Sequence, residues 1–260
     1  MTSFSRLSSG LVRARPTISH VREGLPANRP LEEPAVDFTT LKIPGGAAIW
    51  LLNEHRSRYP ATGQYPFLIG DAEDLARIAD VANFYDQDPV ETIRISLDLN
   101  LLEWMAGEQK FAEEDHGFSA DKMLGDWPGE IANKGSIGLH KDVLSGKIKP
   151  EVYLGLAKIE EPWHLPAILR YGGWNECPAP EVHCALHREW QQRYGAQITG
   201  MSGDIVECVV TKPPTDRNTA TVLAWQQYWY CVDIVEQGCE SVSNLAATLL
   251  NSPYWYFWWD

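Results

Sequence analysis

Carboxylates are the side chains with the clearest capacity for chemistry in the C-terminal part of this sequence. Asp204 and Glu207 stand three residues apart, and Asp233 follows in a later segment. Paired carboxylates can share the acid and base roles of a hydrolysis. A carboxylate-dependent hydrolase that uses Asp204, Glu207 and Asp233 is therefore one hypothesis. The structural alternative is that Asp204 forms a turn and Asp233 caps a helix.

A second candidate is the run Gly172-Gly173-Trp174-Asn175. Glycine permits close backbone approach, the indole offers a stacking face, and the asparagine amide supplies hydrogen-bond donors and acceptors. The run indicates a small-ligand-binding loop built on Trp174 and Asn175. A buried turn, in which the asparagine satisfies backbone groups of the loop, explains the same residues.

Metal ligands form a third candidate, since His183 and His187 stand one helical turn apart and Cys177 lies upstream. Such a trio could hold zinc, but its spacing fits no established signature. Both histidines flank the apolar stripe of their predicted helix, which favours neutral surface histidines. Asp86-Gln87-Asp88 begins like a calcium loop, yet Val90 occupies the third ligand position. We predict neither a metal nor a cofactor.

Charge gives a fourth feature. The chain has 260 residues and a formal charge of −13, which argues against nucleic acid or an anionic membrane as the main partner. Residues 71–130 hold sixteen acidic side chains and four basic ones, including Asp86, Asp88, Glu113, Glu114 and Asp115. They predict a surface complementary to a basic protein. The alternative is an acidic surface that only keeps the protein soluble.

Helices and strands that could position these residues alternate along the chain. Helices are predicted over residues 45–59, 71–82 and 180–194, from Thr215 or Asp216 through Tyr228, and over 241–250. Strands are predicted over residues 65–70, 93–99, 152–156, 197–201 and 205–210. Residues 93–99 could also lead into a helix at 101–105, and residues 106–150 are expected to form a glycine-rich bridge.

The last eight residues, Pro253-Tyr-Trp-Tyr-Phe-Trp-Trp-Asp260, are almost entirely aromatic. As a strand, they would present aromatic rings on both faces. A segment of this kind would aggregate if it were exposed. We therefore expect it to be buried in the sheet, as an inner strand.

The chain divides by composition into three parts. Residues 1–40 are expected to be a flexible extension, although their arginines and serines also resemble an organellar presequence. Residues 41–149 predict an α/β subdomain whose second half is acidic and loop-rich, and residues 150–260 a C-terminal domain. The fold class is α+β, a mixed sheet flanked by helices. Five cysteines and no apolar run long enough for a membrane span indicate reduced thiols and a cytoplasmic location.

An ordered series of motifs in residues 150–260 resembles the bacterial domain of unknown function 4253. The motifs are Gly172-Gly173-Trp174-Asn175 with Pro178, Trp190-x-x-Arg193-Tyr194-Gly195-Ala196, Asp204 and Glu207 before Pro213-Pro214, Gln227-Tyr228, Tyr230-Cys231, Asp233-Ile234-Val235, Gln237-Gly238 and the closing Trp255-Tyr256-Phe257-Trp258-Trp259-Asp260. The resemblance implies a fold unit and a bacterial origin, and it implies no activity.

No complete catalytic motif accompanies the acidic excess and the aromatic richness. We therefore expect a non-catalytic protein-binding protein, of the immunity or antitoxin kind, that neutralises a basic toxin domain encoded nearby. Its binding residues would be Asp86, Asp88, Glu113, Glu114, Asp115, Trp174 and Asn175. The hydrolase and the small-ligand-binding module remain the alternatives.

Overall fold

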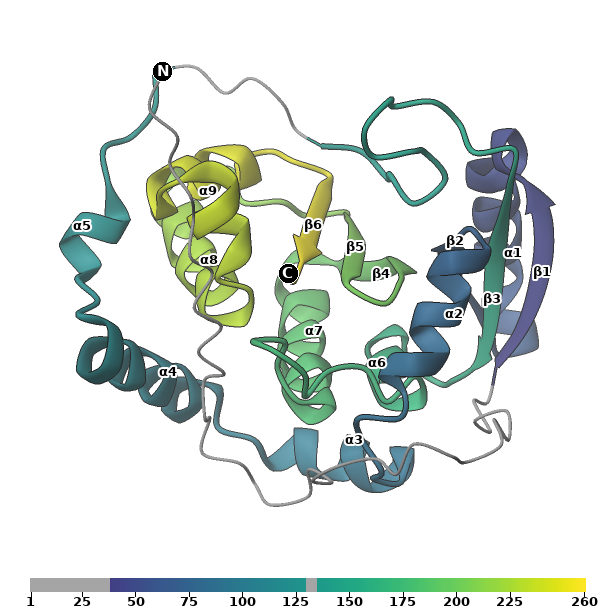
Figure 1. The fold of residues 1–260 in the computed structure, drawn as a ribbon, viewed down its shortest axis with the longest axis horizontal. Helices are drawn as coiled ribbons and strands as arrows, with labels where there is room; N and C mark the ends of the chain where they lie inside the picture. Colours follow the sequence, from purple (N-terminus) through teal and green to yellow (C-terminus); the bar gives the residue numbers. More distant parts are fainter. Residues whose placement is uncertain (1–37, 130–134) are drawn as a thin grey trace, which may run out of the picture.

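The computed structural model describes residues 38–129 and 135–260. The predicted N-terminal extension, and the alternative that it is a presequence, therefore fall almost entirely outside the described residues. The described chain forms helices around one mixed sheet, which confirms the α+β class (Figure 1).

Six strands form the sheet in the order β1-β3-β2-β4-β5-β6. Their bounds are β1 (Phe38–Pro44), β2 (Gln64–Gly70), β3 (Glu151–Lys158), β4 (Ala196–Met201), β5 (Ile205–Val210) and β6 (Tyr254–Trp258). Neighbouring strands are antiparallel except β2 and β4, which are parallel. The predicted boundary near Lys149 and Pro150 lies just before β3, and β3 pairs with both β1 and β2. Strands from the two sides of that boundary thus share one sheet.

Helices cover both faces of this sheet. The α-helices are α1 (Ala48–Thr62), α2 (Ala72–Val81), α3 (Pro89–Asp98), α4 (Leu101–His116), α5 (Ala120–Leu124), α6 (Leu165–Ile168), α7 (Pro180–Tyr194), α8 (Arg217–Tyr230) and α9 (Val242–Leu249). Short turns of other helix types are η1 (Gly45–Ala47), η2 (Pro162–His164) and η3 (Ile234–Cys239). In Figure 1, α1 lies beside β1 and β3, whereas α8 and α9 lie at the opposite end with α4 and α5 outside them. None of the described helices is long and apolar enough to cross a membrane.

The alternation of side chains along the strands separates two cores. In β2, Tyr65, Phe67 and Ile69 join the larger core under α7, α8 and α9, while Leu68 joins a smaller core under α1. Successive strand residues face opposite sides of a sheet. Both faces of β2 are therefore buried, as the apolar run predicts.

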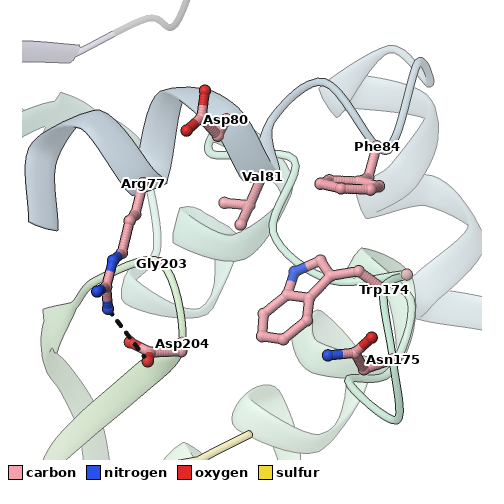
Figure 2. A pocket seen from close by; sticks show the side chains of 9 residues that line it. Arg77, Asp80, Val81, Phe84, Trp174, Asn175, Gly203 and Asp204 are labelled. Atoms are coloured by element: carbon pink, nitrogen blue, oxygen red, sulfur yellow. Dashed lines mark hydrogen bonds and ion pairs between the residues drawn. The ribbon is translucent and has the colours of Figure 1, made fainter. Parts of the chain in front are cut away.

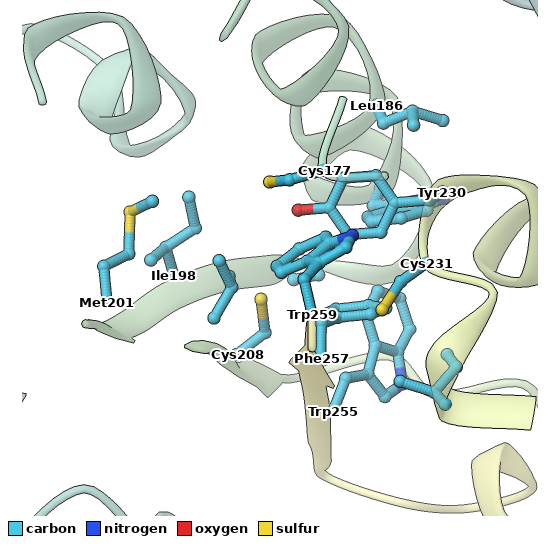
Figure 3. Packing of buried hydrophobic residues seen from close by; sticks show 14 of the residues in the cluster. Cys177, Leu186, Ile198, Met201, Cys208, Tyr230, Cys231, Trp255, Phe257 and Trp259 are labelled. Carbon is cyan, nitrogen blue, oxygen red and sulfur yellow. The ribbon is translucent and has the colours of Figure 1, made fainter. Parts of the chain in front are cut away.

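The aromatic C-terminal strand is part of the sheet, as predicted, but it lies at the edge and is not an inner strand. Trp255, Phe257 and Trp259 are at most 3% exposed and pack into the larger core (Figure 3). Tyr256, on the opposite face, is 43% exposed. The helices over the larger core therefore bury one row of rings although the strand lies at the sheet edge.

The predicted strand over residues 93–99 is wrong, because these residues belong to α3. Asp88 caps this helix by accepting hydrogen bonds from the backbone N–H groups of Val90 and Glu91, and Pro89 occupies the first turn. The helix turns Thr92 and Ser96, one turn apart, into the interior. Small polar residues therefore form the buried face, and the alternating apolar pattern is misleading here. The predicted bridge over residues 106–150 is also partly helical, since it contains most of α4 and all of α5.

Candidate functional site

A pocket of about 480 Å³ opens where α2 meets two loops of the C-terminal region (Figure 2). We call it the Trp174 pocket, and its lining residues are Arg77, Asp80, Val81, Phe84, Gly173, Trp174, Asn175, Gly203 and Asp204. Its volume is within the range of small-ligand sites. The structure thus brings the predicted Trp174 and Asn175 together with Asp204, a carboxylate from the hydrolase hypothesis.

The wall that carries Trp174 is a tight turn that only glycine permits. Gly172 has a φ of 116°, and a Cβ there would collide with the carbonyl oxygen of Pro178. The Gly173 N–H donates to that same oxygen at 3.0 Å. Asn175 adopts a left-handed φ of 46°, which asparagine tolerates better than most residues. The turn fixes the indole of Trp174 against the pocket.

Helix α2 supplies the opposite wall. Asp71 begins it with a capping box, and the buried Ile78 and Val81 anchor it to the larger core. Arg77, one turn before Val81, consequently faces the loop at Gly203. A Cβ on Gly203 would collide with the Cβ of Arg77, so glycine allows the close approach of helix and loop.

Charges in the pocket keep their contact with solvent. The Arg77 guanidinium donates to Glu73 at 2.9 Å and lies 3.5 Å from the Asp204 carboxylate, and these interactions raise the pKa of Arg77. The side chains of Arg77 and Asp204 are 48% and 35% exposed. Asp80 is exposed on the same helix. Arg77 therefore pairs with two carboxylates, Glu73 and Asp204, and a third carboxylate, Asp80, lines the same pocket.

Asp233 does not reach the pocket as a free carboxylate but supports its floor. One of its oxygens accepts from the backbone N–H of Asp260 at 3.1 Å, and the other accepts from Gln237 at 2.8 Å. The Asp260 carbonyl in turn accepts from the Asn175 amide at 3.2 Å. Asp233 thus positions the C-terminal segment, which holds Asn175.

Glu207 lies elsewhere, buried on the side of β5 that faces residues 138 and 139. Its carboxylate accepts from the backbone N–H groups of Gly138 at 2.6 Å and Leu139 at 3.4 Å. Burial raises the pKa of Glu207 to about 7, although these hydrogen bonds oppose the shift. Since Asp204 lines the pocket and Asp233 braces its floor, the three predicted carboxylates have three separate environments. The structure does not assemble them around one substrate.

The expectation of surface histidines is wrong, because His183 and His187 are buried at 0% and 2% exposure. Both contact the Tyr230 hydroxyl, through Nδ1 of His183 at 2.7 Å and Nε2 of His187 at 3.0 Å. Cys177 lies 3.3 Å from His183, and Cys208 lies 3.9 Å from His187. We call these five residues the Tyr230 network. Helix α7 contacts α3, α6 and β4, which buries the flanks of its apolar stripe.

The network satisfies its own polar atoms. The Tyr230 hydroxyl has one proton, so it donates to one histidine and accepts from the other. Burial lowers the pKa of His187 to about 3, which keeps the ring neutral. The described residues contain no group of three or more His, Cys, Asp or Glu side chains arranged to hold a metal ion.

The acidic candidates on α3 and α4 lie outside the Trp174 pocket. Asp88 caps α3, Glu113 accepts from Gln109, and Glu114 pairs with Lys110 at 3.8 Å. Asp86 and Asp115 are exposed. A second hollow, of about 580 Å³, lies between α4 and α8 and includes Glu108, His116, Lys122, Tyr228 and Glu236.

Sequence reasoning missed the contribution of α2 to the pocket. Arg77, Val81 and Phe84 are spaced four and three residues apart, so they share one side of the helix and of the turn after it, and Asp80 lies next to Val81. That spacing was a readable signal. The partner of this side, the Gly203 turn, lies more than a hundred residues away and gives no local signal.

The C-terminal part of the chain is similar to a known protein family. Residues 153–260 match a protein family described as "Domain of unknown function (DUF4253)". This match confirms the resemblance and includes Trp174, Asn175, Asp204 and the residues of the Tyr230 network. Neither the curated proteins nor the solved structures include a significant match to the chain.

Proposed function

We propose that the protein is a non-catalytic binding protein, of the immunity or antitoxin kind, which captures a basic partner protein at the Trp174 pocket. One observation carries the proposal: α2 and two distant loops place aromatic rings and accessible carboxylates around one pocket (Figure 2). Buried aromatic anchors within a charged rim are typical of protein-binding hot spots.

Local charge supports a basic partner. Glu73, Asp80 and Asp204 outnumber Arg77 at this site, and the chain as a whole has a charge of −13. A negative surface accelerates encounter with a positive one and repels acidic competitors. The exposed carboxylates of α4, including Asp115, would contribute to this steering.

The placement of the carboxylates favours binding over hydrolysis. Glu207 holds residues 138 and 139, and Asp233 holds Asp260 and Gln237. Asp204 alone of the three lines the pocket. A hydrolase with shared acid and base roles needs two of them around one substrate.

Binding of a small ligand is the second candidate function, and the pocket volume of about 480 Å³ favours it.

In either case, we propose a cytoplasmic location. None of the five cysteines, all within the described part of the chain, forms a disulfide, and four of them are buried. A reducing compartment suits such thiols.

The test is neutralisation of a toxin encoded by an adjacent reading frame. Co-expression should restore growth, the two proteins should co-purify, and their association rate should fall as salt concentration rises. The double variant Asp80→Asn, Asp204→Asn should weaken the complex by about tenfold or more, which corresponds to about 1.4 kcal/mol. The double variant Glu114→Gln, Asp115→Asn removes the same number of charges outside the pocket and should change mainly the association rate. A toxic neighbour that is neither bound nor neutralised would contradict the proposal.

A further inference from the structure

The Trp174 pocket combines an apolar side and an acidic side. Val81, Phe84 and Trp174 form the apolar side, and Phe84 is 49% exposed (Figure 2). The indole ring of Trp174 lines the pocket, and its buried N–H has no hydrogen-bond partner among the described residues. Asp80 and Asp204 supply the acidic side. A ligand that fits both sides needs a flat face and a positive charge.

The guanidinium of Arg77 already occupies one edge of this site. It neutralises the nearby carboxylates only in part. Its shorter contact, at 2.9 Å, is with Glu73, whereas Asp204 is 3.5 Å away. The other oxygen of Asp204 accepts from the hydroxyl of Ser202 at 3.1 Å. Asp80 is exposed on the neighbouring turn of α2. Arg77 is the only cation among the described residues that line this pocket, whereas Asp80, Asp204 and the neighbouring Glu73 are acidic. The site therefore has a net negative charge, which disfavours anionic ligands.

We propose that the Trp174 pocket binds the guanidinium group of an arginine side chain, which the basic partner inserts beside Arg77. This inference rests on the proposed function, because it names the chemical group by which the partner is recognised. A guanidinium is planar, so it stacks on the indole of Trp174 while its edge donates to Asp204, and Asp80 adds negative charge on the same side of the pocket. A lysine ammonium lacks the plane and is more strongly hydrated.

The experiment titrates the protein with N-acetyl-arginine methylamide and with its uncharged isostere, N-acetyl-citrulline methylamide. The readout is the NMR signal of the Trp174 indole N–H, assigned by its loss in Trp174→Phe. The arginine compound should shift this signal saturably, and the citrulline compound should bind at least about tenfold more weakly. Asp204→Asn and, independently, Asp80→Asn should each weaken arginine binding several-fold.

Arg77→Met gives the sharpest contrast. Methionine keeps much of the apolar stem that packs against Gly203 but removes the internal cation. Binding of the arginine compound should therefore become several-fold tighter. Glu103→Gln, an exposed carboxylate on α4 that does not line the pocket, serves as the matched control and should leave binding unchanged.

Equal binding of the citrulline compound would overturn the inference, as would the absence of a saturable shift or weaker arginine binding in Arg77→Met. The proposed function is tested separately, by the toxin-neutralisation experiment. A partner that is neutralised while arginine binding fails would overturn only the guanidinium assignment. Arginine binding without any neutralised partner would support the assignment and contradict the toxin-neutralising role.

Discussion

The Tyr230 network and the Trp174 pocket are two clusters of aromatic and ionisable residues within one fold, and they differ in access to water. In the network, burial lowers the pKa of His187 to about 3 and raises the pKa of Tyr230 well above its ordinary value. The network therefore consists of neutral side chains that are hydrogen-bonded to one another. In the pocket, the side chains of Arg77 and Asp204 form an ion pair that remains substantially exposed to solvent.

The type of a residue therefore does not by itself predict its role in this protein. Histidine and cysteine are the side chains most often associated with chemistry, but here they satisfy one another inside the larger core. The pocket uses ordinary surface residues, and their charges are available to a partner. Changes in the network should therefore alter stability, whereas changes in the pocket should alter binding.

The largest expected effect comes from Tyr230→Phe. The change removes the hydroxyl that both His183 and His187 contact, so two buried nitrogens lose a partner. Each unsatisfied buried polar group costs about 1–3 kcal/mol. The free energy of unfolding should fall by roughly 2–6 kcal/mol, measured by denaturant titration.

Tyr153→Phe, at a half-buried position on β3, is the matched control and should change the free energy of unfolding by about 0.5 kcal/mol or less. Folded Tyr230→Phe protein should still bind the arginine compound as the unmodified chain does. If Tyr230→Phe left stability intact and weakened ligand binding instead, the division between network and pocket would be wrong.

A pH-dependent change of about 3 kcal/mol is expected from Glu207, which is buried like the network. Its pKa of about 7 in the folded protein lies above the ordinary value of 4.5. The folded state therefore holds more protons between pH 4.5 and 7, and Glu207 makes the free energy of unfolding decrease as pH rises through this range. His187 has the opposite sign, since its lowered pKa makes the unfolded state the better proton acceptor between pH 3 and 6.5.

Glu207→Gln isolates the first of these contributions. Relative to the unmodified chain, the variant should gain about 3 kcal/mol in unfolding free energy between pH 4.5 and 7. Calorimetry at several pH values measures the difference, in which the contribution of His187 cancels. If the difference in unfolding free energy between the two proteins did not change with pH, the pKa of Glu207 would be the same in the folded and unfolded states, which would contradict the prediction.

Local signals predicted much of the fold. Asp71 and Asp216 mark helix starts, Gly195 marks a helix end with a φ of 59°, and the Ser202-Gly203-Asp204 turn joins β4 and β5. Each depends on residues a few positions apart. The sequence also indicated Trp174 and Asn175 as lining a pocket, because the paired glycines before them allow a tight turn.

Features that depend on distant partners could not be predicted. Asp88 and Pro89 before this segment are local signals of a helix start, but no local pattern reveals that Thr92 and Ser96 are buried, so alternation wrongly favoured a strand. Likewise, His183 and His187 flank an apolar stripe in sequence, and only the packing around α7 buries them. The edge position of β6 follows from sheet order, which no local pattern encodes.

The smallest expected effect, about 1 kcal/mol, tests whether an acidic residue of the predicted surface is structural or available to a partner. Asp88→Ala removes both the helix cap and the charge, so α3 should lose about 1 kcal/mol of stability. Asp88→Asn keeps the cap and removes only the charge. Asp115→Asn removes an exposed charge that caps no helix. The free energy of unfolding of both variants should stay within about 0.5 kcal/mol of that of the unmodified chain. Thermal unfolding of the three variants measures these differences. A loss in Asp88→Asn as large as in Asp88→Ala would assign the stabilisation to charge, because only charge is common to the two changes.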